Sequence, residues 1–444
     1  MLLFTNTLTR KKEKFLTAKD KPVSLYVCGI TPYDFAHIGH GRCYVTFDLV
    51  YRLLKFLGYE VTYCRNFTDI DDKILKRSEQ ELGDMYRYAE ITQKYIDSFL
   101  SDMKQLQCLN PTIQPRVTEM IPQIISFIQG LIDKKAAYES QGSVYFRVSS
   151  YQEYGKLSKQ NIKQLQSGAR IQVDDTKEDP LDFALWKKDE KVGFQSPWGQ
   201  GRPGWHIECS AMAQDVFQDT VDIHGGGIDL LFPHHENEIA QSESLYNRSF
   251  VNYWLHNAFV QINKEKMSKS LGNYFTLQDM FKEFDPMVIR FYFLKHHYRN
   301  PLEFAVDDLK AAETTYKRLV NAFKDVSIES IDDIEQVRNH SVVAAMLEYL
   351  QDDMNTSGAL GVLFEKLSLL QDDHEAKSYI KYLLVHVFGL TLQVLPEKKV
   401  IITPEIQNLI NQREQARANK DWTLADKLRD QLQAMGVVLQ DKKL

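Results

Sequence analysis

The chain has 444 residues, 43% of them hydrophobic, and a formal net charge of −6. It is long enough to bury a sizeable core and to divide into roughly two to four structural units. It has no apolar run of about eighteen residues, which a membrane-spanning helix needs, and the apolar stretch at its start is too short for a secretory signal. We therefore expect neither membrane insertion nor export. The acidic balance argues against general nucleic-acid binding but allows a local basic surface.

Five cysteines are scattered along the chain, an odd number that does not suggest a disulfide framework. Free thiols fit a reducing compartment, so we expect a cytoplasmic protein. Free cysteine also packs well in protein cores, and packing is the role that we expect for Cys43, Cys64 and Cys108. The other two, Cys28 and Cys209, lie beside motifs described below.

The first elements in chain order are a strand, a helix and a second strand. Residues 23–28, VSLYVC, form a short apolar run with β-branched and aromatic side chains, which is typical of a buried strand. Residues 41–58 repeat an apolar side chain at every fourth position and end at Gly58, as an amphipathic helix does. Residues 59–69, YEVTYCRNFTD, again have a composition typical of a strand. Such a βαβ unit predicts an α/β fold with a parallel sheet and a ligand site at the carboxyl ends of its strands.

The loop after the first strand, GITPYDFAHIGHGR, places two histidines where the helix begins. A helix amino terminus attracts phosphate through its free N–H groups and its dipole. His37 and His40 can donate hydrogen bonds to a phosphate whose charge grows in a transition state, and Gly39 lets a phosphate or a ring approach the backbone. Taken alone, the segment is equally compatible with a polar loop and capped helix that bind no phosphate.

Residues 232–241, FPHHENEIAQ, set two histidines and two glutamates side by side. If the segment is helical, His234 and Glu238 lie four residues apart on one face, a spacing used by metal ligands. A tetrahedral zinc ion takes three or four protein ligands, so the others must come from elsewhere in the chain. His235 and Glu236 then point away from the metal face, and we expect them to be supporting or surface groups.

Residues 263–274, NKEKMSKSLGNY, form a short polar segment that contains Lys264, Lys266 and Lys269. Its positive charge can bind a polyphosphate, although a lysine-rich loop is more often a solvated surface. Further along, residues 306–398 show apolar side chains at helical spacing and predict a helical bundle. The alternating charges near the carboxyl end predict a pair of solvated helices.

Two of these segments together resemble a known enzyme class. HIGH at 37–40, followed much later by KMSKS at 266–270, is similar to the signature pair of class I aminoacyl-tRNA synthetases. Within that class, YVCGITPYD, GWHIECSAMA and FPHHENEIAQSE resemble segments of the cysteinyl-tRNA synthetase family in order and spacing. The similarity extends over nearly the whole chain. It implies a Rossmann-like parallel sheet with a connective insertion, then an α-helical bundle for anticodon binding and a small carboxyl-terminal domain.

The resemblance assigns nucleotide-binding roles to residues of three segments. His37 and His40 would stabilise the α-phosphate of ATP while an amino-acid carboxylate attacks it, and Lys266 and Lys269 would hold the departing pyrophosphate. Mg²⁺ is expected with the ATP, because the charge of the polyphosphate must be neutralised. Close approach to adenine and binding of ribose hydroxyls need small and acidic residues, and the resemblance assigns these roles to Gly39, Gly226, Gly227 and Asp229.

By the same resemblance, one zinc ion per chain is held by Cys28, Cys209, His234 and Glu238. The thiolate of the substrate cysteine would be a further ligand. A pocket that separates cysteine from alanine or serine by shape gains only about 1–3 kcal/mol, whereas sulfur on zinc is favoured over a hydroxyl and has no counterpart in alanine. Hydrolytic editing is therefore unnecessary. The cysteine pocket is expected to be lined by Thr68, Trp205, His206 and His224.

The resemblance also predicts domain borders. The sequence stops at QDKKL, short of the tail that is common in the family, but keeps Trp422 for base stacking. The insertion is too short to include a large editing domain. The expected parts, in order, are the first half of the catalytic domain (1–115), the connective insertion (116–200), the second half of the catalytic domain (201–257), the KMSKS loop and stem-contact region (258–305), the anticodon-arm bundle (306–398) and a small anticodon-recognition domain of reduced length (399–444).

The predicted function is ATP-dependent activation of L-cysteine and its transfer to tRNA(Cys), with no obligate protein partner. Three other hypotheses remain. A zinc hydrolase or deaminase needs an open metal position and a nearby base, and it does not explain HIGH and KMSKS. A ligase that transfers cysteine to a sugar amine has less need of the long region after residue 306. A non-catalytic RNA-binding relative would have lost some of the site residues.

Overall fold

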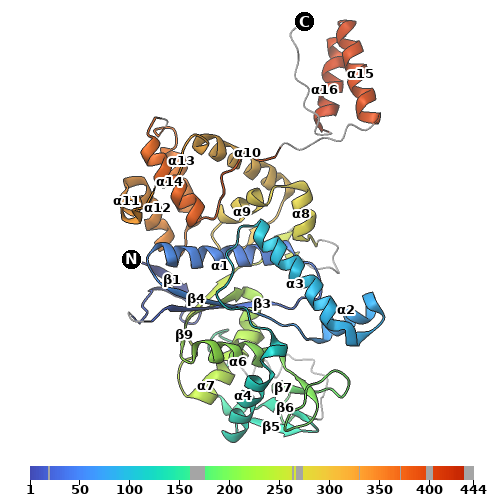
Figure 1. The fold of residues 1–444 in the computed structure, drawn as a ribbon, viewed down its shortest axis with the longest axis vertical. Coiled ribbons are helices and arrows are strands. Elements are labelled where there is room, and N and C mark those ends of the chain that lie inside the picture. The colour runs from blue at the N-terminus through green and yellow to red at the C-terminus, as the bar shows by residue number, and fades with distance from the viewer. Residues whose placement is uncertain are drawn as a thin grey trace. The chain divides into compact units, whose positions relative to one another are not determined.

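The computed structural model describes residues 1–18, 21–160, 176–262, 265–266, 274–329, 331–370, 372–396 and 404–434. The chain forms two units, Met1–Gln393 and Val394–Leu444, and Figure 1 shows the elements of both. Within the described ranges, no helix has both the length and the apolar composition that crossing a membrane requires.

A four-stranded parallel sheet lies at the centre of the first unit. Its strands follow the order β10-β9-β3-β4, and each neighbouring pair is parallel. This sheet confirms the predicted α/β class. The bounds are Val23–Ile30 for β3, Val61–Phe67 for β4, Val221–Gly227 for β9 and Val251–Asn257 for β10.

Helix α1, Ile38–Phe56, links β3 to β4 and confirms the predicted strand–helix–strand unit. It begins earlier than residue 41, because the side chain of His37 caps its amino terminus. In Figure 1, α1 covers one face of the sheet, while α6 (Trp205–Phe217) and α7 (Glu236–Tyr246) lie on the other. The sheet is therefore covered on both faces, as a parallel sheet requires.

The two central strands, β3 and β9, meet where the chain changes direction across the sheet. The connection from β3 leads to β4 on one side, and the connection from β9 leads to β10 on the other. In sheets of this kind, ligands bind at the carboxyl ends of the strands beside such a point. Cys28 lies near the carboxyl end of β3, and Gly226 and Gly227 end β9. The fold thus places residues from two of the predicted segments at one edge of the sheet.

An antiparallel sheet with the order β5-β6-β7-β8 lies in the chain between β4 and β9. Helix α4 contacts β5, α6 and α7, and so joins this sheet to the helices beneath the parallel one. The elements of this region are α2 (Asp72–Leu82), α3 (Tyr88–Gln105), α4 (Ile121–Asp133), β5 (Ala137–Ser140), β6 (Ser143–Phe146), β7 (Phe183–Lys188) and β8 (Gly201–Pro203), with short 3₁₀ turns at Met85–Arg87, Val117–Glu119 and Val148–Ser150.

A short sheet and a series of helices follow β10. The sheet has the order β12-β11-β13, and a separate hairpin, β1-β2, starts the chain. The predicted bundle is present as helices from α10 onward. The bounds are β1 (Leu3–Asn6), β2 (Lys11–Lys14), β11 (Val260–Ile262), β12 (Glu265–Lys266), α8 (Leu277–Glu283), α9 (Pro286–Leu294), β13 (Leu302–Glu303), α10 (Val306–Phe323), α11 (Ile334–Asn339), α12 (Ser341–Gln351), α13 (Thr356–Lys366) and α14 (His374–His386).

The second unit contains a helix pair, as the charge pattern predicts. Helices α15, Pro404–Ala418, and α16, Trp422–Ala434, pack around Ile406 and Leu432. Trp422 is exposed.

Candidate active site

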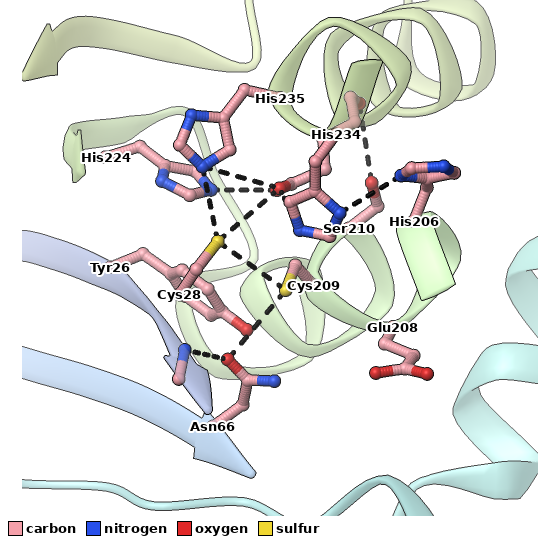
Figure 2. Close-up of polar contacts among 12 residues, drawn as sticks. Tyr26, Cys28, Asn66, His206, Glu208, Cys209, Ser210, His224, His234 and His235 are labelled. Atoms are coloured by element: carbon pink, nitrogen blue, oxygen red, sulfur yellow. Dashed lines mark hydrogen bonds and ion pairs between the residues drawn. The ribbon is translucent and has the colours of Figure 1, made fainter. Parts of the chain in front are cut away.

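Four side chains that the sequence assigns to a metal ion lie together in the structure. Cys28 comes from β3, Cys209 from α6, His234 from the irregular turn Leu231–His235 and Glu238 from α7 (Figure 2). All four are buried, and one ligand atom from each lies within 4.8 Å of the others. His234 Nε2 is 3.0 Å from Glu238 Oε1, so the two side chains share a face as predicted.

This donor set fits a tetrahedral metal ion. The sulfur atoms of Cys28 and Cys209 are 3.8 Å apart, and Cys28 Sγ is 3.7 Å from Glu238 Oε1. Zinc–sulfur bonds of about 2.3 Å at a tetrahedral angle would put two thiolates about 3.8 Å apart. Thiolate, imidazole and carboxylate are all common zinc ligands. The residues present therefore match both the chemistry and the spacing of a zinc site.

The end of β3 turns Cys28 toward the cluster. The pairing of β3 with β4 is irregular at this point, and such irregularities redirect side chains. Asn66 of β4 accepts a hydrogen bond from Gly29 N at 2.9 Å and lies 3.8 Å from Cys209 Sγ. A Cβ atom on Gly29 would lie 1.5 Å from the backbone oxygen of Asn66, so glycine is required directly after Cys28.

The groups of the cluster shift one another's pKa values. Burial opposes ionisation of Glu238, but His224 and His234 outweigh it and hold the pKa of Glu238 at about 2. Contact with Cys28 lowers the pKa of the Cys209 thiol to about 6, while burial raises the pKa of Cys28 well above its usual range. Burial also opposes protonation of His234, but Glu238 and Cys209 raise its pKa to about 10. A metal cation can take the place of this proton between the anionic ligands.

His235 departs from the direction that the sequence predicts. It is fully buried, and its Nε2 atom lies 3.3 Å from Cys28 Sγ (Figure 2). Cys28 comes from β3 and not from the helix. The rings of both His234 and His235 therefore have a nitrogen within 4.8 Å of its sulfur, although they point in different directions from the chain. Cys28, His224, His235 and Glu238 form a second set whose ligand atoms lie within 4.8 Å of one another. His256, which the sequence did not single out, supports His235: its Nε2 atom lies 2.8 Å from His235 Nδ1.

Glu236 is a supporting group and not a surface group. It is fully buried, and its carboxylate accepts hydrogen bonds from the backbone N–H groups of Gly155, Leu157 and Ser158 at 2.9, 3.3 and 2.8 Å. Helix α7, which carries Glu238, is thereby fastened to the segment 155–158. The stretch 232–241 thus combines possible metal ligands with an attachment point for residues 155–158.

Three of the four predicted pocket residues contact the cluster directly. The ring of Trp205 lies over that of His234 with centroids 4.2 Å apart, and His206 Nδ1 is 3.0 Å from His234 Nδ1. His224 is buried and bonded to Glu238. The hydroxyl of Thr68 instead donates at 2.6 Å to Glu208, the residue before Cys209. Glu208 was not predicted, and its position directly before Cys209 was the only signal for it.

The predicted phosphate-binding histidines form a reciprocal cap at the start of α1. His37 Nδ1 accepts a hydrogen bond from His40 N at 3.3 Å, and His40 Nδ1 accepts one from His37 N at 3.2 Å. The two rings stack with centroids 3.7 Å apart. Burial and the neighbouring His37 lower the pKa of His40 well below its usual value. With Nδ1 as acceptor, the neutral ring of His40 carries its proton on Nε2, which makes Nε2 a donor. Gly39 lies between the two histidines in the first turn.

The glycines at the end of β9 lie where a side chain would meet the next turn. A Cβ atom on Gly226 would lie 2.8 Å from Leu230 Cδ1, and one on Gly227 would lie 2.4 Å from Asp229 Oδ1. Asp229 is exposed, in the short turn Ile228–Leu230. The space beside these two glycines is therefore filled by side chains of the turn that follows, and a residue larger than glycine would displace them.

The lysine segment is only partly described. Lys266 lies on β12, whose backbone pairs with Gln261 of β11. Lys264 and Lys269 lie outside the described residues, as does the side chain of Lys266.

The three remaining cysteines are free and stand outside both donor sets. Cys64 is buried, as predicted, whereas Cys43 and Cys108 are half-buried.

Comparison with known proteins agrees with these observations. Residues 14–314 match the family model for the class I (C) tRNA synthetase catalytic domain, and residues 402–444 match the model for the cysteinyl-tRNA ligase anticodon binding domain. The chain is 45% identical to a cysteine--tRNA ligase of Geobacillus thermodenitrificans, over 98% of this chain and 96% of the relative. It is 44% identical to one of Anoxybacillus flavithermus, over 98% and 97%.

Solved structures agree on the fold. A methionyl-tRNA synthetase of Mycobacterium tuberculosis in complex with methionyl-adenylate has a TM-score of 0.62 at 14% identity, covering 84% of this chain and 92% of that one. A leucyl-tRNA synthetase of Agrobacterium radiobacter has a TM-score of 0.58 at 11% identity, covering 84% of each chain. The family-model matches and the near full-length relatives together establish that the chain belongs to the cysteine--tRNA ligase family of class I aminoacyl-tRNA synthetases.

Proposed function

We propose that the chain activates L-cysteine with ATP to cysteinyl-adenylate and then transfers the cysteinyl group to the terminal ribose of tRNA(Cys). The observation that carries this proposal is the buried cluster of Cys28, Cys209, His234 and Glu238 at the carboxyl edge of a class I catalytic sheet. Family membership supports the ligase reaction, and the cluster supplies a chemical reason for the choice of cysteine.

The cluster would hold one Zn²⁺ ion, which supplies a soft binding site for the substrate thiolate and discriminates against a hydroxyl or a methyl group. The chain's own residues keep the donors in place. His224 bonds the Glu238 oxygen Oε2 at 2.8 Å. Trp205 and His206 hold the His234 ring from its other side. We expect these contacts to preorganise the cluster, so that little rearrangement accompanies metal or substrate binding.

Adenylate formation joins a carboxylate oxygen of cysteine to the α-phosphorus of ATP and releases pyrophosphate, with Mg²⁺ accompanying the ATP. We infer that His37 and His40 donate hydrogen bonds to the phosphate, on which negative charge increases in the transition state. The Nε2–H tautomer favoured by the reciprocal cap supports this role. Lys266 and Lys269 would bind the leaving pyrophosphate.

The adenosine part of ATP would lie at the start of α1 and the end of β9. Gly39, Gly226 and Gly227 would let the nucleotide approach the backbone, and Asp229 would accept hydrogen bonds from the ribose hydroxyls. The position of Asp229, exposed in the turn that follows β9, supports this role.

The second half-reaction would use the carboxyl-terminal part of the chain. We propose that the bundle at 306–398 engages the anticodon arm and that 399–444 contacts the anticodon. The match of 402–444 to an anticodon binding domain supports tRNA over a sugar amine as the acceptor. We expect the reaction to take place in the cytoplasm.

The decisive experiment is ATP–pyrophosphate exchange with cysteine, serine and alanine in parallel, before and after removal of bound zinc by a chelator. We expect exchange with cysteine alone, its loss with the zinc, and its return when zinc is added. A folded, zinc-loaded protein that shows no exchange with cysteine would contradict the proposal. Charging of a tRNA(Cys) transcript then distinguishes tRNA from a sugar amine as the acceptor.

A further inference from the structure

A buried arginine, Arg42, lies on α1 two residues after His40 and is 1% exposed. Its guanidinium group donates only to backbone carbonyl groups in the contacts that are described. One nitrogen, Nη1, contacts the carbonyls of Ala258 and Phe259 at 3.2 and 2.8 Å. The other, Nη2, contacts His297 O and Tyr298 O, each at 3.3 Å, and Asn300 O.

These carbonyls belong to two connections that enter one short sheet. Residues 258–259 join β10 to β11, and residues 297–300 lie between α9 and β13. Strand β11 pairs in parallel with β13 and antiparallel with β12, and β12 contains Lys266. Arg42 therefore fastens both entry points of this sheet to α1.

The start of α1 is also attached to the segment that precedes α8. Ile38 N donates to Phe275 O at 3.1 Å, and Leu277 N donates to Ala36 O at 2.8 Å. Together with Arg42, these contacts attach three separate parts of 258–300 to the helix that carries His37 and His40. The side chain of Arg42 is the charged component of this attachment.

The chemistry of Arg42 is specific to arginine. A guanidinium group is planar and presents donors in a fixed fork, so it can bond two chain segments at once in one geometry. A lysine in the same place keeps the charge but has a single nitrogen with rotatable donors. Burial lowers the pKa of Arg42 to about 10, which leaves the group charged at neutral pH.

We propose that Arg42 is a positioning residue for adenylate formation, which sets the β12-β11-β13 sheet against the start of α1 so that Lys266 and the two histidines act on one polyphosphate. This inference rests on the proposed function. It concerns the relative position of two phosphate-binding elements and not contact of Arg42 with ATP. In general, displacement of catalytic groups by about 1 Å costs on the order of 100-fold in rate.

The test uses Arg42→Lys in the full chain, with Arg290→Lys as the matched control. Arg290 is equally buried and donates to the carbonyls of Leu106 and Phe388. It also contacts Asp48 and Cys108, but in the described part of the chain it does not bond to 258–262 or 297–303. We expect Arg42→Lys to lower kcat/KM for ATP in pyrophosphate exchange by at least about 10-fold. Cysteine affinity, measured by direct titration, and zinc content should stay within twofold of the wild type.

A purely structural role predicts another pattern. Arg42→Lys would then reduce thermal stability, and cysteine affinity and kcat/KM for ATP would fall together. Below the unfolding temperature, we expect no such joint loss for Arg42→Lys or for Arg290→Lys. Equal losses for the two substrates, or unchanged exchange kinetics, would overturn the inference. Arg42→Gln, which keeps amide donors, serves as the second variant if the lysine variant does not fold.

Hydrogen–deuterium exchange gives a readout that does not depend on activity. We expect faster exchange of backbone amides in 258–262 and 300–303 in Arg42→Lys than in the wild type, and no such change in Arg290→Lys. Equal protection in the wild type and Arg42→Lys would contradict the positioning role. Absence of cysteine-dependent ATP–pyrophosphate exchange in the wild-type protein would instead contradict the proposed function itself.

Discussion

The two ends of the candidate site are built in different ways. At the amino-acid end, the side chains of Cys28, Cys209, His234 and Glu238 are all buried and gather around one point. At the nucleotide end, the histidines of the HIGH segment are half-buried and are held by backbone N–H groups, and β9 contributes glycine backbone.

This difference corresponds to two kinds of recognition. A soft donor cluster distinguishes sulfur from oxygen and carbon, which shape alone does poorly for small side chains. Under the proposed function, ATP would be recognised mainly by charge and by close approach to the backbone, which backbone N–H groups and glycines provide. If the two ends are independent, a substitution at one end should affect one substrate only.

The strongest test of the amino-acid end is Cys209→Ser. We expect a loss of cysteine affinity larger than the roughly 100-fold that removal of an outer-layer partner costs at metal sites, because a ligand itself is replaced. ATP binding should change little. Zinc content by atomic absorption and separate titrations with cysteine and ATP measure the effects.

Cys64→Ser is the matched control for this change, because Cys64 is equally buried but belongs to neither donor set. It should retain zinc and bind cysteine normally. If Cys209→Ser weakened cysteine and ATP binding equally while the zinc stayed bound, the zinc–thiolate hypothesis would be wrong.

At the nucleotide end, Lys269→Ala should slow adenylate formation by about 100-fold, the effect of removing one donor to a developing charge. Cysteine affinity should stay unchanged. Single-turnover formation of the adenylate, followed with labelled ATP, gives the rate. Unaltered kinetics would remove this lysine from the mechanism.

Gly226→Ala tests whether the two ends are independent, because Gly226 lies between them. The added Cβ would lie 2.8 Å from Leu230 Cδ1 and 3.2 Å from His235 Cε1. Leu230 can turn away at small cost, so we expect a rise in KM for ATP of about 10-fold and little change for cysteine. Gly361→Ala on α13, where a Cβ meets no atom within 4 Å, is the control. A larger loss for cysteine than for ATP would mean that His235 couples the ends.

Local sequence patterns were sufficient for the elements but not for the contacts between them. The apolar run of β3, the apolar side chain at every fourth position of α1 and the strand-like composition of β4 locate these elements, because such patterns depend on neighbouring residues only. Cys28 and Cys209 are 181 positions apart, and no periodicity relates them. Their pairing was predictable only from the family resemblance of the segments around them.

The residues that sequence analysis missed all depend on tertiary placement. His256 meets His235 because β10 lies beside β9, and Glu208 meets Thr68 because α6 packs against β4. Arg42 follows a known motif, yet its partners are backbone carbonyls, whose positions leave no residue-type signal in the sequence. His235 was assigned the wrong direction because the argument used one helix alone.

The smallest expected effect concerns the protonation of His40. Its pKa lies below the ordinary value, because burial and His37 disfavour the charged ring. Between this lowered pKa and about 6.5, the unfolded chain binds one more proton than the folded one, so this group makes stability rise with pH in that window. Above it, the neutral ring keeps Nδ1 as the acceptor of the His37 N–H.

Nitrogen-15 NMR of labelled histidine rings can test this directly. We expect the His40 signals, assigned by their absence in His40→Asn, to show the Nε2–H tautomer and to titrate below pH 6.5. A ring protonated on Nδ1 could not accept the His37 N–H, and such a result would contradict the reciprocal cap. The nucleotide end would then need another source of donors to the phosphate, because His40 Nε2 would carry no proton.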